Sequence, residues 1–273
     1  MKKFITIIVA AVMCVLCSLS LTACSKEARD LDDILKDGKL TIATNAEFAP
    51  FEYKEGSKYL GIDIEIAEYI ADYLGVELVV NNMDFDSVVT SVQKGQSDLA
   101  LAALTINETR KEAIDFSDAY FGAAQYLIVK DSDTTFDACA TKDQVVEKLA
   151  TLSGKAAAQS GTTGYWYVKG SEDFGFDGVS NLTATAFNTA LDAAKAVVNG
   201  QATVAVVDDE VANQIVTSLS GVKAIKIALS SEEYGIGVNK SNTALLYVVN
   251  QVIAGLKESG ALAEIISGYT ANA

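Results

Sequence analysis

The chain has 273 residues, a formal net charge of −15 and no histidine. This length allows one or two α/β domains with a hydrophobic core. The missing histidine excludes a Ser-His-Asp triad and removes the commonest metal ligand, and the acidity argues against a nucleic-acid partner, since phosphate binding needs a basic face.

The first residues predict export from the cytoplasm. Two lysines precede an apolar run over residues 4–21, which is typical of a signal peptide. Residues 21–24, Leu-Thr-Ala-Cys, resemble the bacterial lipobox, so we expect a signal peptide over 1–23, a lipid on Cys24 and a polar tether over 24–37. The alternative is an uncleaved transmembrane anchor, because the run is nearly long enough to span a bilayer. Both interpretations place the folded part outside the cytoplasm.

Strand and helix patterns alternate along the first part of the folded chain. The clearest is an amphipathic helix over Ile62–Leu74, whose isoleucines repeat on one face while Asp63 and the other acids point away from that face. The alternation predicts βαβ units and a largely parallel sheet. The expected elements are strand Leu40–Thr44, helix Ile62–Leu74, strand Val76–Val80, helix Ser87–Lys94, and strands Leu99–Leu104 and Tyr126–Val129.

The second part of the chain begins after Lys130 with a polar stretch of small residues. Thr141 and Gln144 have the spacing of a capping box and predict a helix through Leu152. With a single proline, Pro50, and no low-complexity linker, the halves are expected to be joined by strand-like crossings. The further expected elements are strand Lys155–Gln159, helices Thr162–Val168 and Phe187–Asn199, strand Thr203–Val207, helix Asp208–Leu219, strands Lys223–Ala228 and Tyr234–Val238, and helices Thr243–Glu258 and Leu262–Gly268.

A short internal repeat relates the two halves. A Gly-Gln pair at residues 95–96 precedes an apolar strand, and a second pair at 200–201 does the same. With this offset Ala103 corresponds to Asp208, and each follows at the carboxyl end of a strand, where open α/β sheets bind ligands. The repeat predicts two similar lobes whose strand ends face one cleft.

The stretch after the first Gly-Gln pair also predicts an anion site. Its strand ends at a hydroxyl, Thr105, and one short turn later comes Arg110. A guanidinium matches a carboxylate bidentately, so these groups together suit a small ligand with a carboxylate. The alternative is an N-capped surface helix, with Asn107 as the cap and Arg110 in solvent.

A series of motifs follows from about Leu40 to the C-terminus: Thr44–Tyr53, Gly61–Asp63, Met83–Phe85, Gly95–Leu99, Thr105–Arg110, Asp115–Tyr120, Ser160–Gly164 and Tyr234–Ile236. In order and spacing these resemble the bacterial extracellular solute-binding proteins of family 3, which bind polar amino acids for ABC importers. The resemblance implies a type II periplasmic-binding-protein fold, with two α/β lobes, each a mostly parallel sheet flanked by helices, and a ligand cleft between them. It implies lobe 1 at 38–128 and 232–273 and lobe 2 at 129–231.

The resemblance also implies which residues hold the ligand carboxylate. Arg110 would supply a cation from lobe 1, and Thr162 and Thr163 would act from the start of a lobe 2 helix. A helix N-terminus offers unpaired N–H groups to an anion, which agrees with this role. The alternative for residues 160–164 is a plain turn with an N-cap.

For the ligand ammonium, the resemblance implies Asp208, the Ala103 carbonyl and the Thr105 hydroxyl. The family often has glycine at position 103; alanine still offers its carbonyl but narrows the approach. The alternative for Asp208 is an N-cap, since the two residues after it are acidic and suit the helix dipole.

Phe48 and Phe85 match the aromatic pair that walls the ligand side chain in the family, although ordinary core packing is the alternative. Asn45 is a further expected contact of the ligand, at a position where many relatives carry aspartate. The absence of an acid at this position weakens the case for a basic ligand. Three residues are candidates to compensate: Glu47, Glu52 and Gln125.

The resemblance therefore implies a monomeric, lipid-anchored binding protein without catalysis, metal or cofactor. It would capture a free polar amino acid by closure of the lobes outside the cytoplasm and deliver it to an ABC permease in the membrane. The main rival is a cyclohexadienyl dehydratase on the same scaffold, which needs a general acid in the cleft. Three residues are candidates for that acid: Glu172, Asp173 and Asp177. A sensor that signals to a membrane partner is a third interpretation.

Overall fold

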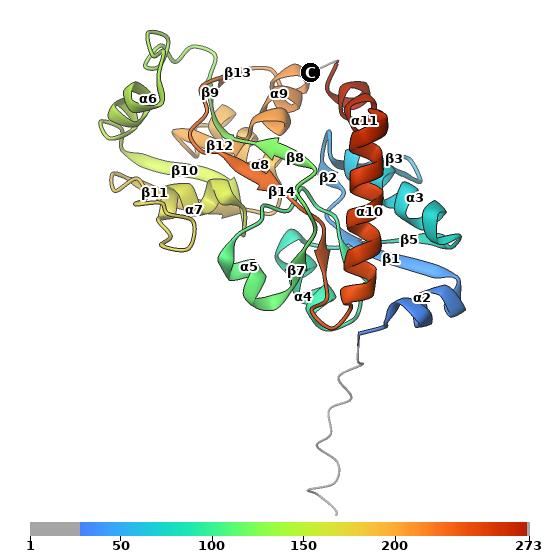
Figure 1. Cartoon of the computed structure of the whole chain (residues 1–273). Helices are drawn as coiled ribbons and strands as arrows, with labels where there is room; N and C mark the ends of the chain where they lie inside the picture. The colour runs from blue at the N-terminus through green and yellow to red at the C-terminus, as the bar shows by residue number, and fades with distance from the viewer. Residues whose placement is uncertain (1–27, 272–273) are drawn as a thin grey trace, which may run out of the picture.

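The computed structural model describes residues 28–271, so the expected signal peptide and the lipobox with Cys24 lie outside the described residues. It has two α/β lobes, each built on a five-stranded sheet with flanking helices (Figure 1). In each sheet one strand runs antiparallel to its two neighbours and the others run parallel to one another. The predicted two-lobed fold with mostly parallel sheets is therefore confirmed.

Lobe 1 contains the sheet β5-β1-β6-β15-β7 and a small sheet β2-β3-β4. The apolar face of α3 is buried, and the C-terminal helices α10 and α11 pack against this helix. Its strands are β1 Lys39–Thr44, β2 Glu47–Phe48, β3 Glu52–Glu55, β4 Lys58–Leu60, β5 Glu77–Asn82, β6 Leu99–Ala100, β7 Asp115–Phe116 and β15 Gly237–Val238. Its helices are α2 Leu31–Asp37, α3 Ile62–Leu74, α4 Phe85–Gln93, α5 Glu108–Ala113, α10 Thr243–Ser259 and α11 Ala261–Thr270.

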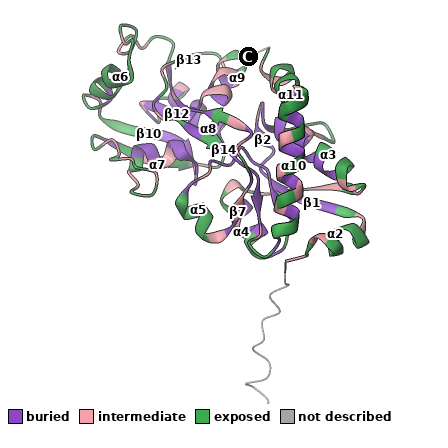
Figure 2. Cartoon of the chain, viewed as in Figure 1, coloured by how far each residue is buried: buried purple, intermediate pink, exposed green. Residues whose placement is uncertain are grey.

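Lobe 2 contains the sheet β11-β10-β12-β9-β13. Its central strand β12 is buried along its whole length, while α6 on the outside is largely exposed (Figure 2). The strands are β9 Gln125–Lys130, β10 Gly154–Gln159, β11 Leu182–Phe187, β12 Val204–Asp208 and β13 Val222–Ile225. The helices are α6 Lys142–Leu149, α7 Thr163–Lys169, α8 Ala190–Val198 and α9 Asp209–Ser218.

The predicted internal repeat corresponds to equivalent strands. β6 and β12 are each third in their sheet order and follow the Gly-Gln pairs. Leu99 pairs with Ile42 of β1, and Val204 pairs in parallel with Ala156 of β10, so the two strands also share their register. Ala103 and Asp208 therefore both follow from equivalent strands, although Asp208 is still the last residue of β12 while Ala103 lies three residues beyond the end of β6.

Two segments connect the lobes, and they carry a short antiparallel pair of β8 Phe121–Ala123 with β14 Glu232–Tyr234. β8 leads into β9, which pairs with β12 and β13 of lobe 2. The boundary expected at residues 128–129 would cut this strand. We propose that lobe 2 begins at Gln125 instead, and that it ends at residue 231 as expected.

The expected tether is folded over its second half. Residues 31–37 form α2, and Arg29 before it pairs with the buried carboxylate of Asp98. The Asn242 amide donates to the carbonyl of Arg29 at 2.9 Å. These contacts attach the segment from Arg29 onward to lobe 1. Among the described residues, none of the helices has the length and apolar character that crossing a membrane requires.

Two expectations about lobe 1 are wrong. The strand expected over Leu99–Leu104 ends at Ala100, because the backbone leaves the strand conformation and Ala103 has a left-handed φ of 46°. Asp63 was expected to point away from the core, but it is completely buried in the first turn of α3.

The expectations for the later elements also need correction. The helix expected from Phe187 begins at Ala190, because Phe187 is the last residue of β11, a strand that we did not predict. The strand expected over Tyr234–Val238 is divided between β14 and β15, which belong to different sheets.

Candidate functional site

The two lobes enclose a small hollow. Its cavity volume is about 10 Å³, roughly the room that one water molecule needs, so a larger ligand enters only when the lobes part or side chains move. The structure brings eight of the nine expected ligand residues together around it. Lobe 1 contributes Phe48, Phe85, Ala103, Thr105 and Arg110, and lobe 2 contributes Thr162, Thr163 and Asp208.

Arg110 reaches the hollow from a capped helix. Asn107 accepts the backbone N–H of Arg110 at 2.8 Å, so the expected cap of α5 is present. Arg110 is nevertheless only 9% exposed, which excludes the alternative that placed its side chain in solvent. Its guanidinium donates to the Thr105 carbonyl at 2.8 Å and, across the cleft, to the Gly161 carbonyl at 3.2 Å. The charge also lies 5.4 Å from the centre of the Phe85 ring.

Burial lowers the pKa of Arg110 to about 10, while the nearby carboxylates of Glu232 and Asp208 oppose this shift. The guanidinium therefore remains a cation at neutral pH. Because it is desolvated, its interaction with an anion is stronger than it would be in water.

Two threonines face Arg110 from lobe 2. Thr162 precedes α7, and its hydroxyl donates to the Gln159 carbonyl at 2.8 Å. The hydroxyl of Thr163 lies 3.1 Å from that of Thr105 in lobe 1. α7 sits close to β12 because Gly164 has no side chain: a Cβ atom there would lie 2.6 Å from the Val206 carbonyl oxygen.

Asp208 ends β12 and precedes α9, but its side chain makes no capping hydrogen bond. It accepts instead from the hydroxyl of Tyr234, which belongs to the connecting strand β14. Burial raises the pKa of Asp208 to about 7, the neighbouring Glu232 adds to this shift, and the Tyr234 hydrogen bond opposes it. Asp208 therefore occupies the N-cap position of α9, as the alternative expected, but its side chain does not cap the helix.

Glu232 is a buried carboxylate that the sequence analysis did not identify. One of its oxygens accepts from the Thr105 hydroxyl at 2.9 Å, and the other accepts from Gln125 at 3.1 Å and from Ser230 at 2.6 Å. The sequence Glu-Glu-Tyr carried no signal of this, because the alternation of buried and exposed residues in β14 appears only in the folded chain.

Asn45, the ninth expected contact, lies outside the lining of the hollow. Its side-chain oxygen accepts from Gln159 of lobe 2 at 2.9 Å, and its amide donates to the Met83 carbonyl at 2.9 Å. Asn45 thus links the two lobes beside the hollow.

The three residues considered as compensating groups differ in exposure. Glu47 is exposed, and Gln125 is buried with its side-chain oxygen lacking a hydrogen bond among the described residues. Glu52 is completely buried, and within residues 28–271 neither of its carboxyl oxygens has a hydrogen-bond partner. Burial, with the charges of Asp63 and Asp208, raises its pKa well above the usual range.

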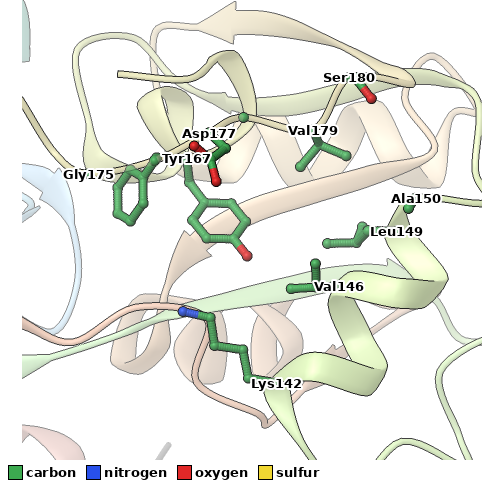
Figure 3. Close-up of a pocket in the computed structure, with 11 residues that line it drawn as sticks. Lys142, Val146, Leu149, Ala150, Tyr167, Gly175, Asp177, Val179 and Ser180 are labelled. Atoms are coloured by element: carbon green, nitrogen blue, oxygen red, sulfur yellow. The ribbon is translucent and has the colours of Figure 1, made fainter. Parts of the chain in front are cut away.

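The three acids considered for a catalytic role, Glu172, Asp173 and Asp177, are all exposed, and none lines the hollow. Asp177 instead borders a larger cavity of about 270 Å³ in lobe 2 (Figure 3). Tyr167 and Lys142 point into that cavity, and no expected ligand residue lines it.

Comparison with known proteins relates the whole folded chain to one family. The model of the bacterial extracellular solute-binding proteins, family 3, matches residues 40–272. The arginine-binding extracellular protein ArtP of Bacillus subtilis (strain 168) is 36% identical over 155 residues, which are 57% of this chain and about half (54%) of ArtP.

Two solved structures are similar over most of the chain. One is AbpA, an amino acid ABC transporter substrate-binding protein from Streptococcus pneumoniae bound to L-arginine, with 30% identity and a TM-score of 0.77 over 88% of this chain and 97% of AbpA. The other is AncCDT-1, an ancestral amino acid-binding protein described as a precursor of cyclohexadienyl dehydratase, with 28% identity and a TM-score of 0.77 over 88% and 99%. The family model matches most of the chain, and the structure has two α/β lobes around a common hollow. This chain therefore belongs to the bacterial extracellular solute-binding proteins, family 3.

Proposed function

We propose that this protein captures a free amino acid with a cationic side chain and delivers it to the permease of an ABC importer. The observation that carries the proposal is that Arg110 of lobe 1 and Asp208 of lobe 2 line the same hollow. A zwitterion needs both a cation and an anion, and a buried guanidinium is well suited to bind its carboxylate. Asp208, with the Ala103 carbonyl and the Thr105 hydroxyl, would receive its ammonium.

The preference for a cationic side chain rests on the excess of buried acids. Asp208, Glu232 and Glu52 are all buried, and Asp208 lies close enough to each of the other two for their charges to interact. Among the described residues, Arg110 is the cation that lines the hollow. Glu52 does not line the hollow in this closed form, and among the described residues it has no hydrogen-bond partner. Burial raises its pKa and so disfavours its ionised form. A ligand cation that comes close to Glu52 would favour the ionised form and pair with it. The relatives ArtP, named as arginine-binding, and AbpA, bound to L-arginine, support the same class of ligand.

Closure of the lobes would couple binding to transport. Several hydrogen bonds already join the lobes around the hollow, including Arg110 to Gly161 and Thr105 to Thr163. A ligand held from both sides binds the closed form better than the open form and shifts the equilibrium by that difference. The permease would then recognise the closed pair of lobes.

A panel of free amino acids tests the ligand class directly. The thermal midpoint of the purified chain should rise with L-arginine or L-lysine, and less or not at all with L-glutamate, since a ligand of the folded state stabilises it. Isothermal titration should then give one site per chain. If no amino acid raises the midpoint, or if L-glutamate raises it most, the proposal is wrong.

Binding without catalysis is part of the proposal. Glu172, Asp173 and Asp177 are exposed and do not line the hollow, so none is placed as a general acid there. Incubation with arogenate or prephenate should yield no aromatic product. Appearance of phenylalanine or phenylpyruvate would favour the dehydratase alternative.

We also propose that a lipid on Cys24 holds the protein at the outer face of the cell membrane. The lipobox-like residues 21–24 support this. The protein should take up radioactive palmitate in cells, and Cys24→Ser should abolish the label and release the protein from the membrane fraction. A labelled Cys24→Ser variant would contradict the proposal.

A further inference from the structure

Ala103 has an unusual backbone. Among residues 28–271 it is the single non-glycine residue with a positive φ, at 46°. This left-handed conformation is disfavoured about tenfold or more for a residue with a side chain, because its Cβ atom approaches the following carbonyl oxygen. Ala103 also lines the hollow between the lobes. Some neighbouring group must therefore hold the backbone in this conformation at the site.

Asp63 is that group. Its Oδ2 atom accepts the backbone N–H of Ala103 at 2.8 Å, and its Oδ1 atom accepts the hydroxyl of Tyr120 at 2.7 Å. The carboxyl is completely buried in the first turn of α3, and among the described residues no cation pairs with it. Burial raises the pKa of Asp63 to about 7, and the hydrogen bonds from Ala103 and Tyr120 oppose this shift because they favour the ionised form. A hydrogen bond to an ionised acceptor is about twice as strong as one between neutral groups, so this contact can fix the peptide.

The other polar group of Ala103 is its carbonyl. Within residues 28–271 no N–H or O–H group donates to it, although Ala103 is only 4% exposed. Nearly all buried backbone carbonyls in folded proteins have a donor. A buried carbonyl without a donor at the edge of the hollow points to a ligand that supplies one.

We propose that Asp63 is a positioning residue for ligand binding: by holding the Ala103 N–H, it keeps Ala103 left-handed and its carbonyl available to the ammonium of the ligand. This inference rests on the proposed function, because the donor is the ammonium of the bound amino acid. It explains why a buried acid is placed on a helix face that otherwise carries isoleucines. Asp63 itself would not touch the ligand.

A double-mutant cycle tests the inference, with L-arginine as the probe and titration calorimetry as the assay. Asp63→Ala should weaken binding about tenfold or more, because Ala103 then leaves the competent conformation most of the time. The same change in an Ala103→Gly background should cost about twofold or less, since glycine adopts positive φ as readily as negative φ. Asp63→Asn keeps an acceptor for the Ala103 N–H and should restore most of the affinity.

Asp98→Ala is the matched control. Asp98 is another buried carboxylate of lobe 1, which accepts the Thr41 N–H at 2.7 Å and does not line the hollow. The Asp98→Ala variant should have a lower thermal midpoint, as Asp63→Ala should, but its affinity for L-arginine should stay within twofold of the wild type.

The remaining outcomes distinguish a failure of this inference from a failure of the proposed function. If Asp63→Ala costs as much affinity in the Ala103→Gly background as in the wild-type background, or costs none in either, the positioning role is overturned while wild-type binding stands. A wild-type chain that binds no amino acid overturns the proposed function instead. If Asp63→Ala does not fold, NMR of the wild type decides: the Ala103 amide proton should resist exchange and shift as Asp63 titrates, and a fast-exchanging, invariant amide overturns the inference.

Discussion

Arg110→Ala would remove the cation that lines the hollow between the lobes. A ligand carboxylate would then be desolvated on closure without a charged partner. Truncating one partner of a buried, hydrogen-bonded charge pair costs about 2–5 kcal/mol. At 1.4 kcal/mol for each tenfold change, we expect the affinity for L-arginine to fall by about 30- to 4,000-fold. The variant would also lose the bonds from Arg110 to Thr105 and Gly161, so its lobes should close less readily.

Two further variants separate charge from shape. Arg110→Lys keeps the charge but loses the planar fork that binds a carboxylate bidentately, so its affinity should lie between those of the wild type and Arg110→Ala. Lys111→Ala is the matched control, because Lys111 lies on the same helix but is exposed and, within residues 28–271, pairs with Glu108 alone. An exposed pair of this kind is worth at most about 1 kcal/mol to stability, and the ligand affinity should not change.

Titration calorimetry at pH 7.5 provides the affinities, and circular dichroism melting shows whether each variant is folded. The reasoning would be refuted by a folded Arg110→Ala protein that binds L-arginine within threefold of the wild type. It would also be refuted if Lys111→Ala lost as much affinity as Arg110→Ala. Either result would place the carboxylate of the ligand elsewhere.

Four other predictions concern charge and closure. Burial raises the pKa of Asp208 to about 7, well above its ordinary value of 3.8, so the folded state binds this proton more tightly than the unfolded state. The melting temperature of the unliganded chain should therefore fall as pH rises from 5 to 8, and it should fall less in Asp208→Asn. Over the same range the affinity for L-arginine should rise, because ionised Asp208 binds the ammonium; titrations showing weaker binding at pH 8 would contradict this. Glu52→Gln should raise the melting temperature of the unliganded chain but weaken L-arginine binding about tenfold or more, and equal affinity in calorimetry would exclude Glu52 from recognition. Gly161→Ala should weaken binding about tenfold, because Gly161 has a φ of 72° and an added Cβ would lie 2.1 Å from Asp86 across the cleft. At saturating L-arginine, small-angle scattering should show a larger radius of gyration for this variant than for the wild type. An unchanged radius would contradict this role of Gly161 in closure.

The sequence predicted those elements whose periodicity is strong. The helix over Ile62–Leu74 begins and ends where expected, because its isoleucines repeat at helical spacing and Gly75 takes the left-handed conformation at its end. β11 was missed, since Leu182–Phe187 alternates threonine with alanine and has little of the apolar character that marks a strand.

Most of the expected ligand residues lie at the hollow because they follow the carboxyl ends of equivalent strands, which local sequence can indicate. Burial of charge was harder to predict. Asp63 has the sequence signature of a solvated acid in the first turn of a helix. Its burial is explained by contacts with Ala103 and Tyr120, which lie 40 and 57 residues away in the sequence. Glu232 reaches Thr105 across 127 residues, through a connecting strand whose pairing cannot be read from its own residues.

The charged groups at the hollow already have hydrogen-bond partners within the protein, and this determines how a ligand would act. Arg110 of lobe 1 donates to the Gly161 carbonyl of lobe 2, and Asp208 of lobe 2 accepts from Tyr234 on the connecting strand. A zwitterion that binds between Arg110 and Asp208 would have to replace or share these contacts. The free energy that drives closure is then the difference between the ligand contacts and the protein contacts, and not their sum. Under the proposed mechanism, a ligand with only one charged end would satisfy only one lobe, so it would favour closure far less than an amino acid does.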